Sequence, residues 1–296
     1  MKIRFIFNPF SGRNRHDPRL RERARRFLRE EGLAGDVVET ERPRHATELA
    51  AAAVADGCTR VVAIGGDGTM NEVATALTGT PVVFGLIPCG SGNGLGRHLG
   101  IPGPGEGAFH TLLHGHPRAI DTGLVNGFAF FNAMGLGFEA EIAVRFSRLE
   151  RRGLAGYVRA GVPAFFHHRP EHCIISAGPD TLRREVLTLA VMNSDQYGND
   201  AIIAPGARVD DGRFDLVAVP PVGLIRAGAL LWRLAAGSFE RAPGVTRLRG
   251  DRFVIERPQA GWIHTDGEPR ATTARLEISL RPRSLQVMVP AGAGEA

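Results

Sequence analysis

The first third of the chain alternates short apolar runs with segments that carry apolar residues at helical spacing. The apolar runs are rich in β-branched and aromatic residues, which is typical of buried strands. Strands are expected at Ile3–Phe7, at Asp36–Thr40, and in the runs that begin at Arg60 and Val82. Helices are expected after Asp17-Pro18, over residues 46–54, after Thr69, and up to Leu113. This order predicts a mainly parallel, doubly wound α/β sheet.

The pattern changes near Asp121, where strands become frequent. Residues 120–125 and 128–134 flank Asn126-Gly127, the dipeptide typical of a type I′ hairpin turn. Further strands are expected over residues 173–177, 186–192, 214–219, 253–256, 262–265, 276–280 and 284–289, and helices over 138–149, 154–166 and 224–236. The sequence therefore predicts a nucleotide-binding α/β domain over residues 1–121 and a β-rich domain over 122–283, with a tail from about 284 that can return to the first domain.

Three expected strands run directly into polar or glycine-rich loops. One loop is Gly65-Gly66-Asp67-Gly68-Thr69, and the others begin at Asn8 and at Pro88. A strand, a glycine turn and a helix together present backbone N–H groups to an anion, and glycine lets a phosphate approach the main chain. Asp67 would act through a cation or a water, because a carboxylate repels phosphate. Thr69 is expected as the helix N-cap, with Glu72 completing a capping box.

The near absence of lysine excludes several classes of phosphate-binding enzyme. Lys2 is the only lysine among 296 residues. This excludes P-loop NTPases and protein kinases, which need a phosphate-binding lysine. Neither glycine loop carries Gly-x-Gly-x-x-Gly at a helix start, so a dehydrogenase-type dinucleotide fold has little support.

Charge and hydropathy bear on the partner and the compartment. The net charge of +5 and the pI of about 9.8 fit an anionic partner, or alternatively reflect the arginine-rich composition. The arginines from Arg13 to Arg29 are expected mostly on the solvated face of a helix. No apolar run reaches the roughly 18 residues of a membrane span, and no signal-peptide pattern is seen, so cytoplasmic residence is expected.

Five motifs in order resemble the diacylglycerol kinase catalytic-domain family, which comprises bacterial soluble lipid kinases and their sphingosine and ceramide kinase relatives. They are Asn8-Pro9-x-Ser11-Gly12, Gly65-Gly66-Asp67-Gly68-Thr69-x-Asn71-Glu72, Pro88-x-Gly90-Ser91-x-Asn93, Asp210-Asp211-Gly212 and Asp266-Gly267-Glu268. The resemblance implies a two-domain kinase, with an NAD kinase-like α/β domain, a C-terminal β-sandwich and ATP in the cleft between them. The implied ATP-binding residues are Asn8, Pro9, Ser11, Gly12, Thr40, Gly65, Gly66, Asp67, Gly68, Thr69, Asn71, Glu72, Gly90, Ser91 and Asn93.

The later motifs imply a metal site and a base. The Asp-Asp-Gly turn resembles the family's structural Mg²⁺ site, with the Asp211 side chain and the backbone carbonyls of Arg208 and Arg213 as ligands; an ordinary turn is the alternative. Asp266-Gly267-Glu268 resembles the catalytic segment, in which one carboxylate takes the proton of the lipid hydroxyl. Glu268 is favoured as base, with Asp266 as partner and Asp67 near Mg²⁺. Residue type alone predicts a hairpin turn here.

The sequence does not identify the lipid substrate. The preferred activity is ATP- and Mg²⁺-dependent phosphorylation of diacylglycerol or a related glycerolipid at a membrane surface, with no nucleic-acid partner. Ser91 stands where the bacterial branch commonly has threonine, and Glu141 matches an acidic position near the amine of sphingosine, so a sphingoid-base or ceramide-type kinase is an alternative. An NAD kinase and a non-catalytic nucleotide- or lipid-binding module are further alternatives. A homodimer through an exposed strand edge also stays open.

Overall fold

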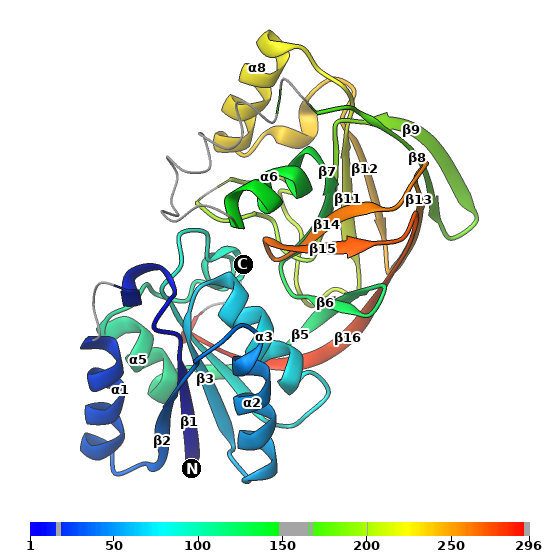
Figure 1. The fold of residues 1–296 in the computed structure, drawn as a ribbon. Helices are drawn as coiled ribbons and strands as arrows, with labels where there is room; N and C mark the ends of the chain where they lie inside the picture. Colours follow the sequence, from blue (N-terminus) through cyan, green and yellow to red (C-terminus); the bar gives the residue numbers. More distant parts are fainter. Residues whose placement is uncertain (16–18, 148–164, 166–167, 200, 293–296) are drawn as a thin grey trace. The chain divides into compact units, whose positions relative to one another are not determined.

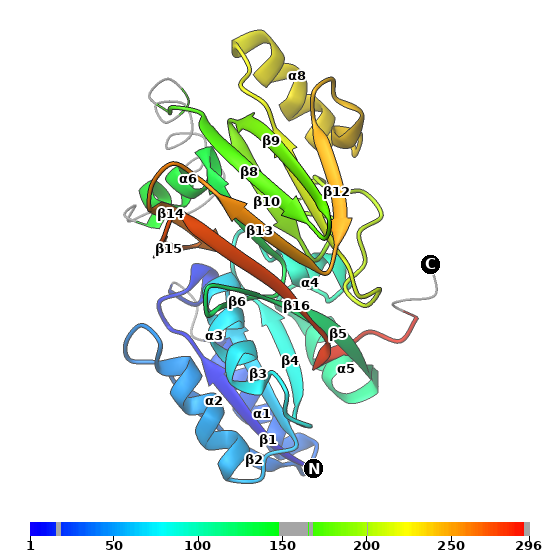
Figure 2. The same cartoon turned by 90° about the vertical axis from the view of Figure 1, so that its right-hand side faces the viewer.

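The chain forms two compact units, shown in the computed structural model of Figures 1 and 2. The structure describes residues 1–15, 19–147, 165, 168–199 and 201–292. The first unit comprises residues 1–120 with 283–296, and the second comprises residues 121–282. Each unit has its own hydrophobic core.

The first unit is built on four parallel strands in the order β2-β1-β3-β4. They are β1 (Lys2–Phe7), β2 (Ala34–Glu39), β3 (Arg60–Gly65) and β4 (Val83–Pro88). The apolar runs of β1, β3 and β4 are buried by helices on both faces, as in other parallel sheets, while the edge strand β2 is only partly buried. Near the end of the chain, Val287 pairs in parallel with Phe84 of β4, so the last strand extends this sheet.

Helices cover both faces of this sheet (Figure 1). Phe27 and Phe109 pack against Phe5 of β1, with ring centroids 6.0 and 6.2 Å from it. The helices are α1 (Arg19–Glu30) and α5 (Glu106–His114) on that face, and α2 (His45–Ala55) and α3 (Asp67–Leu77) on the other, with the short η1 (Gly12–Arg15) and α4 (Gly94–His98) in the loops. The expected N-cap Asp17 lies outside the described residues.

The second unit contains two antiparallel arrays of strands. One is a six-stranded sheet in the order β12-β11-β10-β7-β14-β15: β12 (Thr246–Gly250), β11 (Phe214–Val219), β10 (Thr188–Met192), β7 (Ala133–Gly137), β14 (Gly261–Thr265) and β15 (Glu268–Thr272). The other joins the first part of β16 to β13, β8 and β9, with the hairpin β5-β6 beside it: β16 (Arg275–Val289), β13 (Arg252–Glu256), β8 (Glu171–Ala177), β9 (Asp180–Val186), β5 (His116–Val125) and β6 (Phe128–Phe130).

Apolar side chains from the two arrays meet in one core, as in a β-sandwich. One sheet contributes Met134, Leu189 and Val191, and the opposite array contributes Ile175 and Phe253, all fully buried. The β5-β6 hairpin has the expected turn, since Asn126 and Gly127 adopt φ values of 46° and 86°. The predicted architecture, an α/β domain followed by a β-sandwich, is confirmed.

The helices of the second unit fall largely where the apolar spacing predicts them. They are α6 (Phe138–Ser147), α8 (Leu224–Ala235) and the short η2 (Phe239–Arg241). The helix expected over residues 154–166 lies almost wholly outside the described residues. Among the helices that the structure describes, none is long and apolar enough to cross a bilayer.

Several strand predictions were wrong or incomplete. The two strands expected over 276–280 and 284–289 are one strand, β16, which passes through the polar stretch between them although Arg283 there adopts φ 47°. The single strand expected over 186–192 is divided at Leu187 between β9 and β10. β9, β12 and β15 were not predicted. All three are edge strands, and their few buried positions leave no alternating apolar signal.

Candidate functional site

The three predicted loops meet at one edge of the parallel sheet. Phe7 pairs with Ile64, and Gly65 pairs with Pro88, so β1, β3 and β4 end side by side. The backbone N–H of Thr40 donates to the carbonyl of Phe7 at 2.9 Å, which brings the end of β2 to the same edge. Ligands of open α/β sheets bind at this carboxyl edge.

Hydrogen bonds tie the loops to one another. Asn8 Nδ2 donates to Thr69 Oγ1 at 2.9 Å, which joins the first loop to the helix after the second. The backbone N–H of Cys89 donates to the carbonyl of Gly65 at 2.7 Å, and that of Arg13 donates to the carbonyl of Cys89 at 3.2 Å. The three loops therefore form one connected structure.

Glycine is required because the loops touch through their backbones. A Cβ on Gly90 would lie 2.8 Å from the Cα of Gly66. Gly12 has φ 41°, and a Cβ there would lie 2.0 Å from the carbonyl oxygen of Cys89. From the sequence, we expected glycine here so that a phosphate could approach the main chain. The structure adds a second reason, which is contact between neighbouring loops.

Asp67 links two of the loops through its carboxylate. Its Oδ2 accepts the backbone N–H of Asn93 at 2.9 Å, and its Oδ1 accepts that of Gly94 at 3.2 Å. The carboxylate thus satisfies N–H groups at the start of α4. Its expected contact with a cation stays a prediction.

The expected capping box at α3 was wrong. The N-cap is Gly66, and the buried Thr69 hydroxyl accepts a bond from Asn8 instead. Glu72 points to the neighbouring helix, where its carboxylate accepts the backbone N–H groups of Arg44 and Ala46 at 3.0 and 3.1 Å. Both side chains act between elements, and local spacing cannot reveal such partners.

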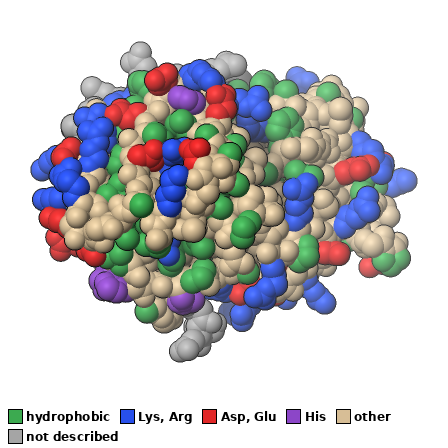
Figure 3. Space-filling model, turned by 90° about the horizontal axis from the view of Figure 1, so that it is seen from below, with side chains coloured by type: hydrophobic (Ala, Val, Ile, Leu, Met, Phe, Trp, Pro, Cys, Tyr) green, Lys and Arg blue, Asp and Glu red, His purple; other side chains and the backbone are tan. Residues whose placement is uncertain are grey.

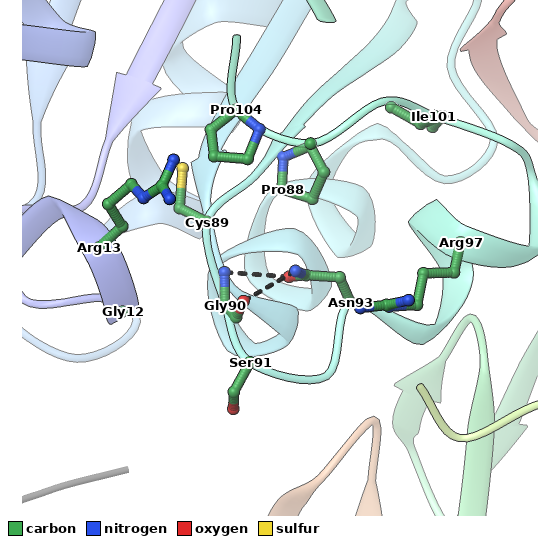
Figure 4. Close-up of a pocket in the computed structure, with 11 residues that line it drawn as sticks. Gly12, Arg13, Pro88, Cys89, Gly90, Ser91, Asn93, Arg97, Ile101 and Pro104 are labelled. Atoms are coloured by element: carbon green, nitrogen blue, oxygen red, sulfur yellow. Dashed lines mark hydrogen bonds between the residues drawn. The ribbon is translucent and has the colours of Figure 1, made fainter. Parts of the chain in front are cut away.

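A pocket of about 550 Å³ opens beside the loops (Figure 4). It is lined by Gly12, Arg13, Pro88, Cys89, Gly90, Ser91, Asn93, Arg97, Ile101, Gly103 and Pro104. The guanidinium groups of Arg13 and Arg97 give it positive charge, which suits an anionic ligand. Arg97 also donates to the carbonyl of Gly92 at 3.2 Å.

The side chains of this pocket divide into loop supports and groups open to a ligand. Asn93 supports the loop, because its amide accepts the N–H of Gly90 at 3.0 Å and donates to the Gly90 carbonyl at 2.8 Å. Ser91 is exposed, and Figure 4 shows its hydroxyl pointing away from that loop. Burial raises the pKa of the Cys89 thiol to about 12, which keeps it protonated at neutral pH.

The Asp-Asp-Gly turn lies in the second unit, before β11. Asp211 accepts the backbone N–H of Arg213 at 3.1 Å and a guanidinium N–H of Arg249 at 2.6 Å. Gly212 donates its N–H to the fully buried Asp121 at 2.8 Å. In the described part of the chain no three His, Cys, Asp or Glu side chains gather as a metal cluster. The donors expected for Mg²⁺ are one carboxylate and two backbone carbonyls. Such a site suits a hard cation and does not require a cluster of three such side chains.

The Asp-Gly-Glu motif is the turn of the β14-β15 hairpin. Asp266 and Gly267 have φ values of 50° and 83°, and Thr265 pairs with Glu268 across the turn. The Asp266 carboxylate is buried and accepts the backbone N–H groups of residues 131, 132 and 133 at 2.8–3.3 Å. The Glu268 side chain is only half-buried. The two carboxylates therefore have different surroundings.

Beside this hairpin lies a buried polar cluster that the sequence did not reveal. Tyr197 donates its hydroxyl to Glu139 Oε2, and His264 Nε2 lies 3.5 Å from the same oxygen. The backbone N–H of Gly267 donates to His264 Nδ1 at 3.3 Å, which connects the cluster to the turn. Glu139 Oε1 is buried without a hydrogen-bond partner among the described residues. In the sequence, the only indication of this cluster was that Glu139 lies two residues after an apolar strand.

Glu141, the expected substrate residue, already has two partners on the described chain. Its carboxylate accepts from Arg145 at 2.5 Å and lies 3.1 Å from His168 Nδ1. The His168 side chain is buried, so its contact with Glu141 is part of the local packing.

Three of the six arginines of α1 are paired with glutamates on the same helix. Arg25, Arg26 and Arg29 lie 3.6–3.7 Å from glutamates of α1. On the face shown in Figure 3, basic side chains are likewise interspersed with acidic ones. This agrees with the expected solvated helix face.

Comparison with known proteins follows the same two-part division. Residues 2–125 match the model of the diacylglycerol kinase catalytic domain, and residues 132–289 match the YegS C-terminal NAD kinase beta sandwich-like domain. A solved structure of a diacylglycerol kinase from Bacillus anthracis str. Sterne superposes with a TM-score of 0.73, covering 99% of this chain and 98% of its own at 18% identity. That likeness shows the fold.

Curated relatives show the family. The protein named "Probable lipid kinase YegS-like" from Pseudomonas aeruginosa (strain UCBPP-PA14) is 32% identical over 276 residues, which cover 92% of this chain and 86% of the relative. The protein of the same name from Pseudomonas putida is 32% identical over 270 residues, covering 90% and 88%. With both domains matched in order, the chain belongs to the YegS-like lipid kinase family, whose members carry a diacylglycerol kinase catalytic domain.

Proposed function

We propose that this protein transfers the γ-phosphate of ATP to the hydroxyl of diacylglycerol or a related glycerolipid. The observation that carries the proposal is the set of three interlocked loops at one sheet edge, beside a pocket with Arg13 and Arg97. Backbone N–H groups and guanidinium groups are the partners that phosphates need. The membership of the lipid kinase family supports a lipid as the acceptor.

The chain's own residues would divide the work of binding and transfer. The loops 8–12, 65–72 and 90–93, with Thr40, would hold the phosphates, and Asp67 would keep two of these loops in register. Glu268 would take the proton of the acceptor hydroxyl, while Asp266 holds the hairpin that carries it. Phosphoryl transfer depends mainly on positioning and charge neutralisation, so these roles suffice without a covalent nucleophile.

A divalent cation fits this proposal. Mg²⁺ would neutralise charge that develops on the transferred phosphoryl group. Asp211 with the carbonyls of Arg208 and Arg213 would hold a structural Mg²⁺, and the buried Asp121 would fix the turn that carries them. A soluble enzyme of this kind would meet its substrate by peripheral contact with a membrane.

The surroundings of Glu141 favour a glycerolipid over a sphingoid base. A sphingoid amine would have to compete with Arg145 and His168 for this carboxylate. A neutral diacylglycerol needs no such counter-charge.

The test is a kinase assay over a panel of lipids with identification of products by mass spectrometry. Purified protein, ATP and Mg²⁺ are incubated with vesicles that contain diacylglycerol, monoacylglycerol, phosphatidylglycerol or sphingosine, and in parallel with NAD. We expect phosphorylated glycerolipid, with transfer reduced at least about 10²-fold in Asp67→Ala, because loops that lose their register would lose phosphate contacts of the size that one transition-state donor supplies. Phosphorylated sphingosine, NADP, or no product from any acceptor would refute the proposal.

A further inference from the structure

Helix α8 carries most of the large apolar side chains that the structure exposes. Seven large hydrophobic residues among those described are exposed, and four of them lie on α8. Their exposed fractions are 60% for Leu224, 92% for Ile225, 68% for Leu231 and 69% for Trp232. Grouped exposed apolar residues mark an interaction surface, whereas single ones are ordinary.

The opposite face anchors the helix to the second unit. Leu230 and Leu234 pack against a buried cluster that includes Met192 and Phe239. Arg233 donates to the carbonyl of Ser238 at 3.4 Å, which fastens the end of the helix. Among the described residues, η2 and its adjoining loops lie beside α8 in Figures 1 and 2. The helix is thus fixed on one side and apolar on the other.

The charges of α8 indicate which partner this face suits. Residues 224–235 include Arg226 and Arg233 but no aspartate or glutamate, and the preceding residues 220–223 are uncharged. A helix with leucine, isoleucine and tryptophan on one face and only basic charges is typical of elements that lie in the interface of an anionic bilayer.

We propose that the outer face of α8, formed by Leu224, Ile225, Leu231 and Trp232, docks on an anionic lipid bilayer. Trp232 and the aliphatic side chains enter the headgroup–acyl boundary, and the basic charge of the helix attracts the anionic headgroups. The inference deepens the proposed function and rests on it, since it assigns the membrane contact of a lipid kinase to one helix.

Fluorescence of Trp232 tests this docking directly. The chain has two tryptophans, so Trp262→Phe leaves Trp232 as the single indole. This full-length variant is mixed, without ATP, with vesicles of phosphatidylcholine and phosphatidylglycerol whose acyl chains are brominated. We expect the Trp232 emission to shift to shorter wavelength and to be quenched. Protein that sediments with the vesicles while Trp232 stays unquenched would overturn the proposal, because another surface would then bind.

A charge placed on the same face provides the second measurement. Ile225→Asp should lower vesicle partitioning at least about tenfold, because a carboxylate in the headgroup region loses apolar contact and is repelled by anionic lipid. The fold should persist, since Ile225 is almost fully exposed and an acidic residue suits the first turn of a helix. Ala260→Asp, at an exposed position before β14, adds the same charge elsewhere on the unit and should leave partitioning unchanged.

The outcomes separate docking from catalysis. If Ile225→Asp leaves partitioning unchanged but converts a dimer into a monomer, the face binds a second copy and the docking proposal is wrong. Vesicle binding through α8 with no phosphorylated lipid in the panel would refute the proposed function alone. Transfer to detergent-dispersed lipid with no vesicle binding would refute docking alone.

Discussion

Asp266 and Glu268 lie two residues apart, and their surroundings assign them different tasks. Asp266 is buried and accepts three consecutive backbone N–H groups, while Glu268 begins β15 with a half-buried side chain. A carboxylate held by several N–H donors fixes the backbone around it, and a base must remain accessible to its substrate. Spacing alone could not separate the two, because the donors come from a loop more than 130 residues earlier in the chain.

Substitution of each carboxylate in turn separates their two roles. Glu268→Gln should reduce phosphoryl transfer about 10²- to 10⁴-fold, the usual contribution of a general base, without changing the thermal midpoint or ATP binding. Asp266→Asn should instead lower the free energy of unfolding by about 1–3 kcal/mol, since an amide leaves buried N–H donors poorly paired. Single-turnover rates and urea unfolding measure both. An Asp266→Asn protein that is stable but inactive, beside an active Glu268→Gln protein, would reverse the assignment.

Glu139 shows how a buried charge depends on its neighbours. The residue is 7% exposed, and its carboxylate accepts a hydrogen bond from the Tyr197 hydroxyl. Tyr197→Phe should cost about 1–3 kcal/mol of unfolding free energy, because a buried charge loses its donor. Glu139→Gln removes the group that needs this donor. The Glu139→Gln/Tyr197→Phe variant should therefore lose less unfolding free energy than the two single variants lose in sum. Additive urea-unfolding values would show that the two side chains act independently.

At the level of elements, the glycine loops that we propose for ligand binding also join strands together. The sequence indicated the loops because each follows a buried apolar strand, and parallel register then places them at one edge. It could not indicate that Gly66 and Gly90 touch through backbone atoms, because that contact depends on how two loops pack in space. The same limit explains why Glu72 was assigned to its own helix rather than to α2.

A methyl group placed between the loops tests this packing. Gly90→Ala should lower the free energy of unfolding by about 1–3 kcal/mol, the usual cost of overpacking, because its Cβ meets the backbone of Gly66. Gly103→Ala is the matched control, since no atom lies within 4 Å of a Cβ there. Urea unfolding of both variants is the measurement, and equal midpoints would contradict the close approach of the loops.

Sequence predicted the strands of this fold according to their burial. Strands with near-continuous burial, such as β3, β4 and β11, appear as apolar runs and were predicted. β9 and β12 lie at sheet edges with polar residues on both faces, so no period of two marks them. The β-rich character of the second unit therefore followed from the sequence, while the number and order of its strands did not.

At the level of the whole molecule, few groups titrate in mildly alkaline solution. The chain has one lysine, two tyrosines and three cysteines. Burial raises the pKa of Cys89 and of Cys173 from 9.0 to about 12, so the folded protein holds these two protons more tightly than the unfolded chain. Their contribution to stability is complete below pH 9 and is lost as the pH rises toward 12.

Replacement of these two cysteines should flatten the alkaline decline in stability. Each buried thiol contributes a slope of up to about 1.4 kcal/mol per pH unit between its two pKa values. The Cys89→Ala/Cys173→Ala protein should therefore lose less stability than the wild type between pH 9 and pH 11, whatever its stability at pH 7. Urea midpoints over this range provide the comparison. Identical slopes would show that other groups govern alkaline unfolding.

The central claim is that the carboxyl edge of β1, β3 and β4 holds the phosphates of ATP. A crystal structure with Mg²⁺ and a non-hydrolysable ATP analogue tests it most directly. We predict density for the phosphates against the backbone of residues 66–69 and within hydrogen-bonding reach of Ser91, with the guanidinium of Arg13 or Arg97 turned toward them. Nucleotide bound elsewhere, with this edge left to solvent, would contradict the account.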